Sequence, residues 1–379
     1  RRVPCAPTCK RHNRRVALEF SARVARLPSY PVAGGYAEHA PPVRLASNES
    51  PYPPLPAVRD AISRALAELN RYPDPSNSLL RRTLSDRYGV AESRIAIGNG
   101  SCDILLAAGE ALLEPGAELV YAWPSFSIYP HLGAASGARA IEVALDDDDR
   151  HDLPAMLREI TVATRLALVC NPNNPTSTAI PLGEIAAFLD EVPPHVCVIV
   201  DEAYCEFNLL EDPDASIDLL DRHPNLALLR TFSKVHGLCG LRVGFALCGS
   251  DQLPRALDQV RQPFFCNALA QAAAVEALGH QDEVIDRVAR NVAERISVDE
   301  RLRALGLAPA ESQANFCWFR VGERGHVGEP EETAVMAALR ERGVLVRGGS
   351  ALGEPGALRV TYGTPEENAR FLDALAESL

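Results

Sequence analysis

The sequence predicts an α/β fold in which a mostly parallel, seven-stranded sheet is covered by helices and followed by a smaller α+β domain. Short apolar, partly β-branched runs at 166–169 and 196–200 are typical of strands buried on both faces. Between about residues 56 and 249, such runs alternate with segments of helical periodicity. That alternation indicates a parallel sheet with helical crossovers.

Taken in order, the chain divides into three predicted parts. Residues 1–50 form an N-terminal arm, and its first 26 residues are basic. We expect these 26 residues to be partly disordered or to wrap around a partner. The alternative is an arginine-rich transit peptide. Residues 51–255 form the large domain and 256–379 the small one. Before the large sheet we expect a strand at 45–49 and a helix at 56–69. In the small domain we expect helices at 267–278 and 284–305 and strands at 315–320, 344–346 and 358–361.

Composition narrows the class of protein. A chain of 379 residues with 47% hydrophobic side chains can bury a core of about two domains. Its 38 basic and 50 acidic residues give a net charge of −12, which argues against a nucleic-acid partner, and no apolar stretch is long enough to predict a membrane span. The ten cysteines lack metal-ligand or disulfide spacing, so we interpret most as buried small hydrophobes of a cytoplasmic protein.

Lys234 is the most informative single residue. The buried run 226–229 leads to it, and a glycine-containing turn follows. A partly desolvated lysine beside the cation of Arg242 loses its proton more readily, and only a neutral amine forms a Schiff base with an aldehyde. This placement predicts pyridoxal phosphate as the cofactor.

Two other strand ends carry side chains that suit this cofactor. Asp201 follows the strand at 196–200, and a carboxylate against the pyridine nitrogen keeps that ring protonated as an electron sink. Asn174 lies in a proline-fixed loop after the strand at 166–169, from which its amide can bond the phenolic oxygen. Taken alone, the loop is also explained as a simple turn.

A phosphate site is predicted where the strand at 94–97 meets a helix. The turn contains Gly100, Ser101 and Cys102, and free backbone N–H groups at a helix start bind anions. Ser233 and Arg242 would complete the cup. A plain helix cap is the other interpretation of Ser101.

These stretches, in this order and each at a strand end, resemble the fold-type I pyridoxal-phosphate aminotransferases of class I/II. The resemblance is to the histidinol-phosphate aminotransferase and actinobacterial aromatic aminotransferase branch, and it extends over about residues 45–361. It implies that Lys234, Asp201 and Tyr204 are catalytic. The cofactor-binding set that it implies is Lys234, Asp201, Tyr204, Asn174, Gly100, Ser101, Cys102, Phe126, Ser233, Arg242 and Tyr72.

The same resemblance implies a substrate site and a dimer. Arg359 would bind the α-carboxylate of the amino donor, which explains a cation inside an apolar strand. Tyr52, Asn174 and Arg347 are the other expected substrate contacts, although a surface position is equally consistent with the sequence around Arg347. Tyr72 matches a tyrosine that reaches the phosphate in the neighbouring subunit, so we expect a homodimer with shared active sites.

The implied reaction moves an amino group from a small amino donor to a 2-oxo acid, with Lys234 as both tether and base. Several departures leave the substrate open between histidinol phosphate and an aromatic amino acid: Ser177 and Pro53 replace glycines, Phe126 a tyrosine, Cys239 an alanine, and His236 an aromatic residue. We expect His236, Cys239 and Cys266 to be packing residues. Decarboxylation, β-elimination or oxidative deamination on the same fold is the alternative chemistry, and a non-catalytic binding protein is a third possibility.

Overall fold

The computed structural model describes residues 18–27, 43–321 and 329–379. Its centre is a seven-stranded sheet in the order β2-β8-β7-β6-β5-β3-β4, in which β8 runs antiparallel to its two neighbours and the other pairings are parallel. The strands are β2 (Ile95–Gly98), β3 (Glu118–Trp123), β4 (Arg139–Ala144), β5 (Thr164–Cys170), β6 (Cys197–Asp201), β7 (Leu226–Thr231) and β8 (Gly244–Cys248). The predicted mostly parallel sheet is therefore confirmed.

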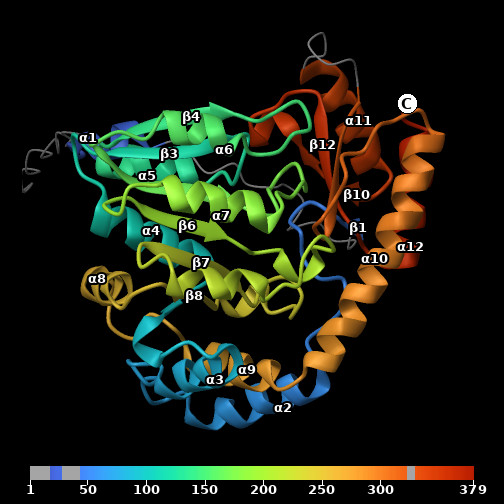
Figure 1. Cartoon of the computed structure of the whole chain (residues 1–379). Helices are drawn as coiled ribbons and strands as arrows, with labels where there is room; N and C mark the ends of the chain where they lie inside the picture. Colours follow the sequence, from blue (N-terminus) through green and yellow to red (C-terminus); the bar gives the residue numbers. More distant parts are fainter. Residues whose placement is uncertain (1–17, 28–42, 322–328) are drawn as a thin grey trace, which may run out of the picture.

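Helices cover both faces of this sheet, which is why its central strands are apolar along most of their length (Figure 1). One face packs against α2 (Pro56–Ala65), α3 (Ser78–Tyr88), α6 (Leu153–Arg158), α7 (Leu182–Glu191) and α9 (Ala268–Leu278). The other packs against α4 (Ser101–Leu112), α5 (Tyr129–Ser136) and α8 (Gln252–Val260), and α1 (Ala22–Arg26) lies beside α5. Short 3-10 turns occur at Leu66–Glu68, Glu92–Arg94, Cys205–Phe207, Ala215–Asp221, Cys239–Leu241 and Gly349–Leu352.

A smaller sheet with its own core follows. It is antiparallel, in the order β11-β12-β9, from β9 (Phe316–Arg320), β11 (Arg347–Gly348) and β12 (Ala357–Thr361). The helices α10 (Gln281–Ala304), α11 (Glu329–Glu341) and α12 (Pro365–Ala376) pack around it. Figure 1 shows α10 running from the α2 end of the molecule to this small sheet, so it joins the two cores.

The predicted strand at 45–49 is wrong. The strand here is β1 (Val43–Arg44), which pairs in parallel with β10 (Val344–Leu345), and the chain then turns toward the large sheet. The reason is Asn48, whose φ of 53° lies in the left-handed region and ends an extended conformation. Asn48 is 1% exposed, so beyond the backbone hydrogen bonds of Leu45 with Leu345 and Thr361 a buried residue determines the path of this segment.

The boundary predicted at residue 255 separates α9 from the helices that it packs against. Residues of α9, such as Ala273 and Leu278, belong to the core on the α2 face of the large sheet. We propose a boundary near residue 280, where α10 begins. Residues 1–17 and 28–42 of the predicted basic arm lie outside the described residues.

Four predicted motifs leave the sheet at one edge. Strands β2, β5, β6 and β7 run in the same direction, so their carboxyl ends and the loops that follow converge there. Among the described helices, none combines the length and the apolar character that a membrane crossing requires.

Candidate active site

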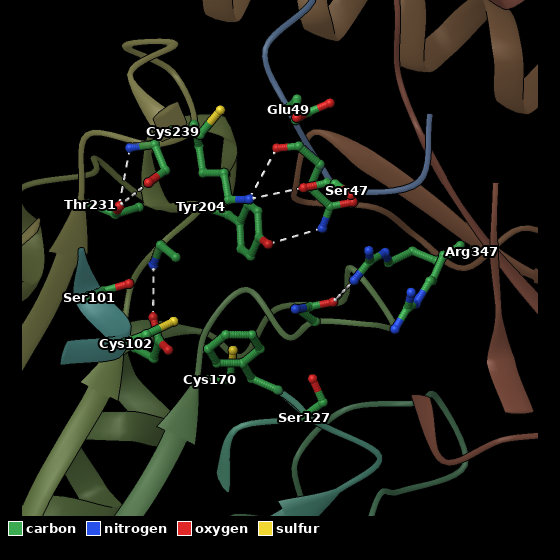
Figure 2. A pocket seen from close by; sticks show the side chains of 18 of the residues that line it. Ser47, Glu49, Ser101, Cys102, Ser127, Cys170, Tyr204, Thr231, Cys239 and Arg347 are labelled. Carbon is green, nitrogen blue, oxygen red and sulfur yellow. Dashed lines mark hydrogen bonds between the residues drawn. The ribbon is translucent and has the colours of Figure 1, made fainter. Parts of the chain in front are cut away.

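The converging loops enclose a cavity of about 450 Å³ (Figure 2). In Figure 2, Ser101 and Cys102 lie on one side of the view, Tyr204 near the middle and Arg347 on the opposite side. Eleven of the predicted site residues line the cavity: Ser101, Cys102, Phe126, Asn174, Asp201, Tyr204, Ser233, Lys234, Arg242, Arg347 and Arg359. The structure thus brings together side chains from both sheets.

Lys234 follows β7, is half-buried and lines the cavity. Its Nζ donates to the backbone oxygens of Asn48, at 3.1 Å, and Ser47, at 3.4 Å. Burial, reinforced by the positive charge of Arg359, lowers the pKa of Lys234 to about 8. The sequence predicted Arg242 as this cation; the structure assigns the effect to Arg359 instead.

Asp201 ends β6 and is 3% exposed. Its Oδ2 accepts a hydrogen bond from the hydroxyl of Tyr129 at 3.1 Å, and its Oδ1 accepts one from the N–H of Ala203 at 3.3 Å. Burial raises the pKa of Asp201 to about 6, and the bond from Tyr129 opposes that rise. The carboxylate is thus ionised at neutral pH and faces the cavity, where it can hold a cationic ring nitrogen.

Tyr204 and Asn48 form a second fixed unit. The amide of Asn48 donates to the hydroxyl of Tyr204 at 3.0 Å, as the dashed line beside Tyr204 in Figure 2 shows. The backbone N–H of Asn48 donates to Thr361 Oγ1 at 2.9 Å. Since Asn48 also accepts from Lys234, this one residue positions the predicted phenol and the predicted amine together.

The residues of the predicted phosphate cup meet at the start of α4. Ser101 is the first helical residue, so the N–H groups of Ser101 and Cys102 have no partner within the helix, whereas that of Asp103 donates to the backbone oxygen of Gly100 at 3.2 Å. A Cβ at Gly100 would lie 2.3 Å from Nη2 of Arg242, which shows that the guanidinium lies directly over this turn. Ser233 completes the cup, and its hydroxyl accepts from that of Thr231 at 2.9 Å. This donor set fits a phosphate dianion.

Two arginines approach from the small sheet. Arg359 is 7% exposed; its Nη1 donates to Asn174 Oδ1, and its Nη2 donates to the backbone oxygen of Ala46 at 2.7 Å. Arg347 is 8% exposed and lines the same cavity, so the surface position considered from the sequence is wrong. A buried guanidinium is stabilised by an anionic ligand, and this cavity admits one.

Three predicted residues do not line the cavity. Gly100 leaves room for the guanidinium of Arg242, as described above. Tyr52 lies in a second hollow of about 260 Å³, where the guanidinium of Arg290 sits 5.4 Å from its ring centroid. Tyr72 is 81% exposed and stacks on Phe264 at 4.4 Å. Their roles toward substrate and cofactor stay predictions.

The residues that the sequence analysis singled out as departures or as packing cysteines lie in different parts of the structure. His236 is stacked at a tilt on Phe232, and burial lowers its pKa to about 4, so it is neutral at physiological pH. Cys266 lies in the core of the large sheet, whereas Cys239 lines the cavity rather than only packing. Ser177 adopts a φ of 63°, the conformation for which a glycine is suited.

Tyr129 and Asn48 are functional residues that the sequence analysis missed. Tyr129 is the first residue of α5, in a segment that resembles ordinary core, and it is 72 residues from Asp201 in the chain. No local pattern reveals such a partner. The same holds for Asn48, which lies in the polar run 47–50 and is buried only through partners far along the chain.

Comparison with known proteins agrees with this geometry. The model of the family described as aminotransferase class I and II matches residues 40–375. The aromatic amino acid aminotransferase of Thermobifida fusca is 46% identical over 331 residues, 87% of this chain and 88% of that protein. Histidinol-phosphate aminotransferase 2 of Ralstonia nicotianae is 43% identical over 364 residues, 96% of this chain and 92% of that protein.

A solved structure gives the same result. Histidinol-phosphate aminotransferase from Sinorhizobium meliloti, in complex with pyridoxal-5'-phosphate, superposes with a TM-score of 0.80 at 30% identity and covers 88% of this chain and 90% of that chain. The predicted fold class, enzyme class and cofactor are thereby confirmed. Matched over most of its length, this chain belongs to the class I and II aminotransferases, which are pyridoxal-phosphate enzymes.

Proposed function

We propose that this chain moves the amino group of an aromatic amino acid to a 2-oxo acid, with Lys234 binding the cofactor as a Schiff base. The observation that carries the proposal is that Lys234, Asp201 and Arg359 line one cavity. They supply an amine with a pKa of about 8, a buried carboxylate and a buried guanidinium. These are the base, the ring-nitrogen partner and the carboxylate site that transamination needs.

The cofactor site is proposed residue by residue. Ser101, Ser233 and Arg242 would bind the phosphate, with Gly100 leaving room for the guanidinium and Cys102 forming the adjoining wall. Bound here, pyridoxal phosphate supplies an electron sink for the reacting carbon.

The ring would be held by other residues. Tyr204 and Asn174 would meet its phenolic oxygen, and Phe126 would stack on its face. Asp201, ionised above a pH of about 6, would hold the proton on the ring nitrogen.

Lys234 does the proton transfer. With pyridoxal phosphate bound, its neutral Nζ would take the proton from the donor's Cα, and the resulting ammonium would be the proton donor for the second part of the transfer. Arg359 binds the donor carboxylate, and Asn174, which accepts from Arg359, fixes the plane of the guanidinium. The backbone oxygens of Ser47 and Asn48 aim the amine.

The donor is proposed from the rest of the cavity. Phe126 and Leu352 offer apolar surface for an aromatic ring. Arg347 favours a second candidate, histidinol phosphate, because a second buried guanidinium can bind a phosphate. Decarboxylation, β-elimination and oxidative deamination are not favoured, since the matched relatives are named as aminotransferases.

The partners would be a small amino donor and a 2-oxo acid acceptor, and the proposed assembly is a homodimer. Tyr72 supports it: an aromatic side chain that is 81% exposed and stacked on Phe264 is suited to a subunit interface. We propose that it reaches the phosphate cup of the other subunit. Every cysteine in the described residues is a free thiol, which supports a reducing compartment such as the cytoplasm.

The test is a half-reaction followed by absorbance. Holoenzyme is mixed with L-phenylalanine, L-tyrosine or histidinol phosphate without an acceptor, and the conversion of the aldehyde form of the cofactor to its amine form is recorded. Rapid conversion by an aromatic amino acid, reversed by 2-oxoglutarate, is the expected result. Release of CO₂ or peroxide instead of a keto acid would reject transamination.

Arg347→Gln separates the two donor candidates. If histidinol phosphate is the donor, the loss of a charge-assisted contact to its phosphate should lower kcat/KM about tenfold or more while sparing phenylalanine. Equal losses for both donors would remove the argument for histidinol phosphate. Arg342→Gln, which breaks an exposed pair with Glu377, is the matched control.

A further inference from the structure

An ion pair joins the small sheet to a turn that follows β4 of the large sheet. Arg320, the last residue of β9, donates from Nη1 to Asp149 Oδ2 at 3.0 Å and from Nη2 to Asp149 Oδ1 at 2.8 Å. The side chains are 22% and 10% exposed. Two parallel charge-assisted bonds in a partly buried place fix both distance and orientation.

Asp149 also holds the loop that carries Asn174. Its backbone oxygen accepts from Thr176 Oγ1 at 2.9 Å and from Thr178 Oγ1 at 2.6 Å. The loop is closed by the N–H of Ser177, which donates to the backbone oxygen of Asn173 at 2.8 Å. Any movement of Asp149 is thus passed to Asn174, the acceptor for Arg359.

The guanidinium of Arg320 also binds the turn that forms a second wall of the cavity. Arg320 Nε donates to Glu354 Oε1 at 2.6 Å, and the N–H of Glu354 donates to the backbone oxygen of Gly349 at 2.9 Å. This turn contains Leu352 and follows Arg347, both of which line the cavity. One arginine therefore connects the turn with Leu352 to the turn that supports Asn174.

We propose that Arg320 and Asp149 are positioning residues for the amino donor. Neither lines the cavity. Together they set the distance between two walls of the cavity. The wall with Asn174 and Arg359 receives the donor's carboxylate, and the wall with Leu352 receives the donor's side chain. The inference rests on transamination but not on which donor is used.

The structure provides a clean substitution for the test. Asp149 has a φ of 60°, a conformation that Asp and Asn tolerate better than most residues, so Asp149→Asn removes the charge without a new backbone demand. Arg320→Gln removes the other partner. Arg150→Gln is the matched control, because it breaks the ion pair with Asp146 in the same turn and does not involve the small sheet.

The first measurement is steady-state kinetics of the holoenzyme with L-phenylalanine and 2-oxoglutarate. In Asp149→Asn and Arg320→Gln, KM for phenylalanine should rise about tenfold while kcat changes less than about threefold, since ground-state placement is lost and the reacting groups are intact. The affinity for pyridoxal phosphate should not change. The double variant should lose no more than Arg320→Gln alone, because Asp149→Asn affects an ion pair that Arg320→Gln has already broken.

The second measurement is amide hydrogen exchange, which needs no donor. In Asp149→Asn the amides of Ser177 and Gln313 should exchange faster than in the wild type, because they bond within and to the Asn174 loop. Arg150→Gln should leave them unchanged. If the wild type does not convert phenylalanine, the proposed donor fails, and exchange alone decides the positioning role. Unchanged exchange, or a lower thermal stability with an unchanged KM, would overturn it.

Discussion

The guanidinium of Arg242 lies directly over Gly100, so close that a Cβ at residue 100 would come within 2.3 Å of Nη2. Gly100 also has a φ of 82°, which other residues rarely adopt. Arg242 itself has a φ of 62°, an unusual conformation of the kind that concentrates at functional sites. The turn and the arginine are thus shaped for each other, and together they offer their hydrogen-bond donors to an anion beside them.

Gly100→Ala should therefore weaken cofactor binding. The methyl group displaces Arg242, and the loss of a charge-assisted bond to the phosphate corresponds to about tenfold or more in affinity. Titration of the apoenzyme with pyridoxal phosphate measures this. Gly183→Ala, where nothing lies within 4 Å of the added Cβ, is the control and should bind normally. Normal binding by Gly100→Ala would mean that Arg242 does not take the phosphate.

Lys234 should react as a neutral amine over an unusual pH range. Burial and Arg359 lower the pKa of Lys234 to about 8, so the neutral fraction of its amine rises through that pH. When the apoenzyme is mixed with pyridoxal phosphate and reduced with borohydride, the yield of trapped Schiff base should therefore rise with pH and reach half its maximum near pH 8. Removing the cation favours the protonated amine, so Arg359→Gln should shift this midpoint upward. Arg347→Gln, a second buried arginine of the cavity, is the control and should shift it less. Equal shifts would contradict a specific effect of Arg359.

Tyr129→Phe tests whether the hydroxyl of Tyr129 lowers the pKa of Asp201. The hydroxyl stabilises the ionised carboxylate, so its loss should raise the pKa of Asp201 above the present value of about 6. A protonated Asp201 cannot hold a cationic ring nitrogen, and kcat at pH 7 should fall about fivefold and recover as the pH rises. Tyr121→Phe, which removes a bond to Glu142 away from the cavity, should leave the pH profile unchanged. An identical profile in Tyr129→Phe would show that Asp201 does not depend on it.

Much of the site was predictable from sequence because its residues occupy strand ends. A buried apolar strand is a local pattern, and the parallel arrangement brings Lys234, Asp201 and Asn174 to one edge without any knowledge of their contacts. The cup at Ser101 was predictable for a similar reason, since a helix start always has free N–H groups.

The features of the site that the sequence did not predict depend on contacts between segments that are distant in the chain. Arg359 reaches Lys234 only because the small sheet folds back over the large one, so the sequence named the neighbouring Arg242 instead. Asn48 ends a predicted strand by adopting a left-handed conformation that its bonds to Tyr204 and Thr361 stabilise. Ion pairs such as Arg320 with Asp149 leave no periodicity in the sequence, because each partner alone resembles an ordinary surface charge.

Asp299 in the small domain should make stability depend on pH. Burial raises its pKa from 3.8 to about 6, so between these values the folded state binds more protons than the unfolded state, and the free energy of unfolding falls as pH rises. Asp299→Asn keeps an acceptor for the hydroxyl of Tyr362, which lies 3.0 Å from Oδ1, and removes the buried charge.

Asp299→Asn should therefore be more stable than the wild type at pH 7.5 by about 1 to 3 kcal/mol, and nearly equal to it at pH 4, where both side chains are neutral. Denaturant unfolding of the holoenzyme at the two pH values measures the difference. Asp373→Asn, which affects only the exposed pair with Arg301, should change stability by less than about 1 kcal/mol at either pH. A variant that is less stable than the wild type at pH 7.5 would show that the ionised carboxylate, through Arg295 and Arg303, is a net stabilising group.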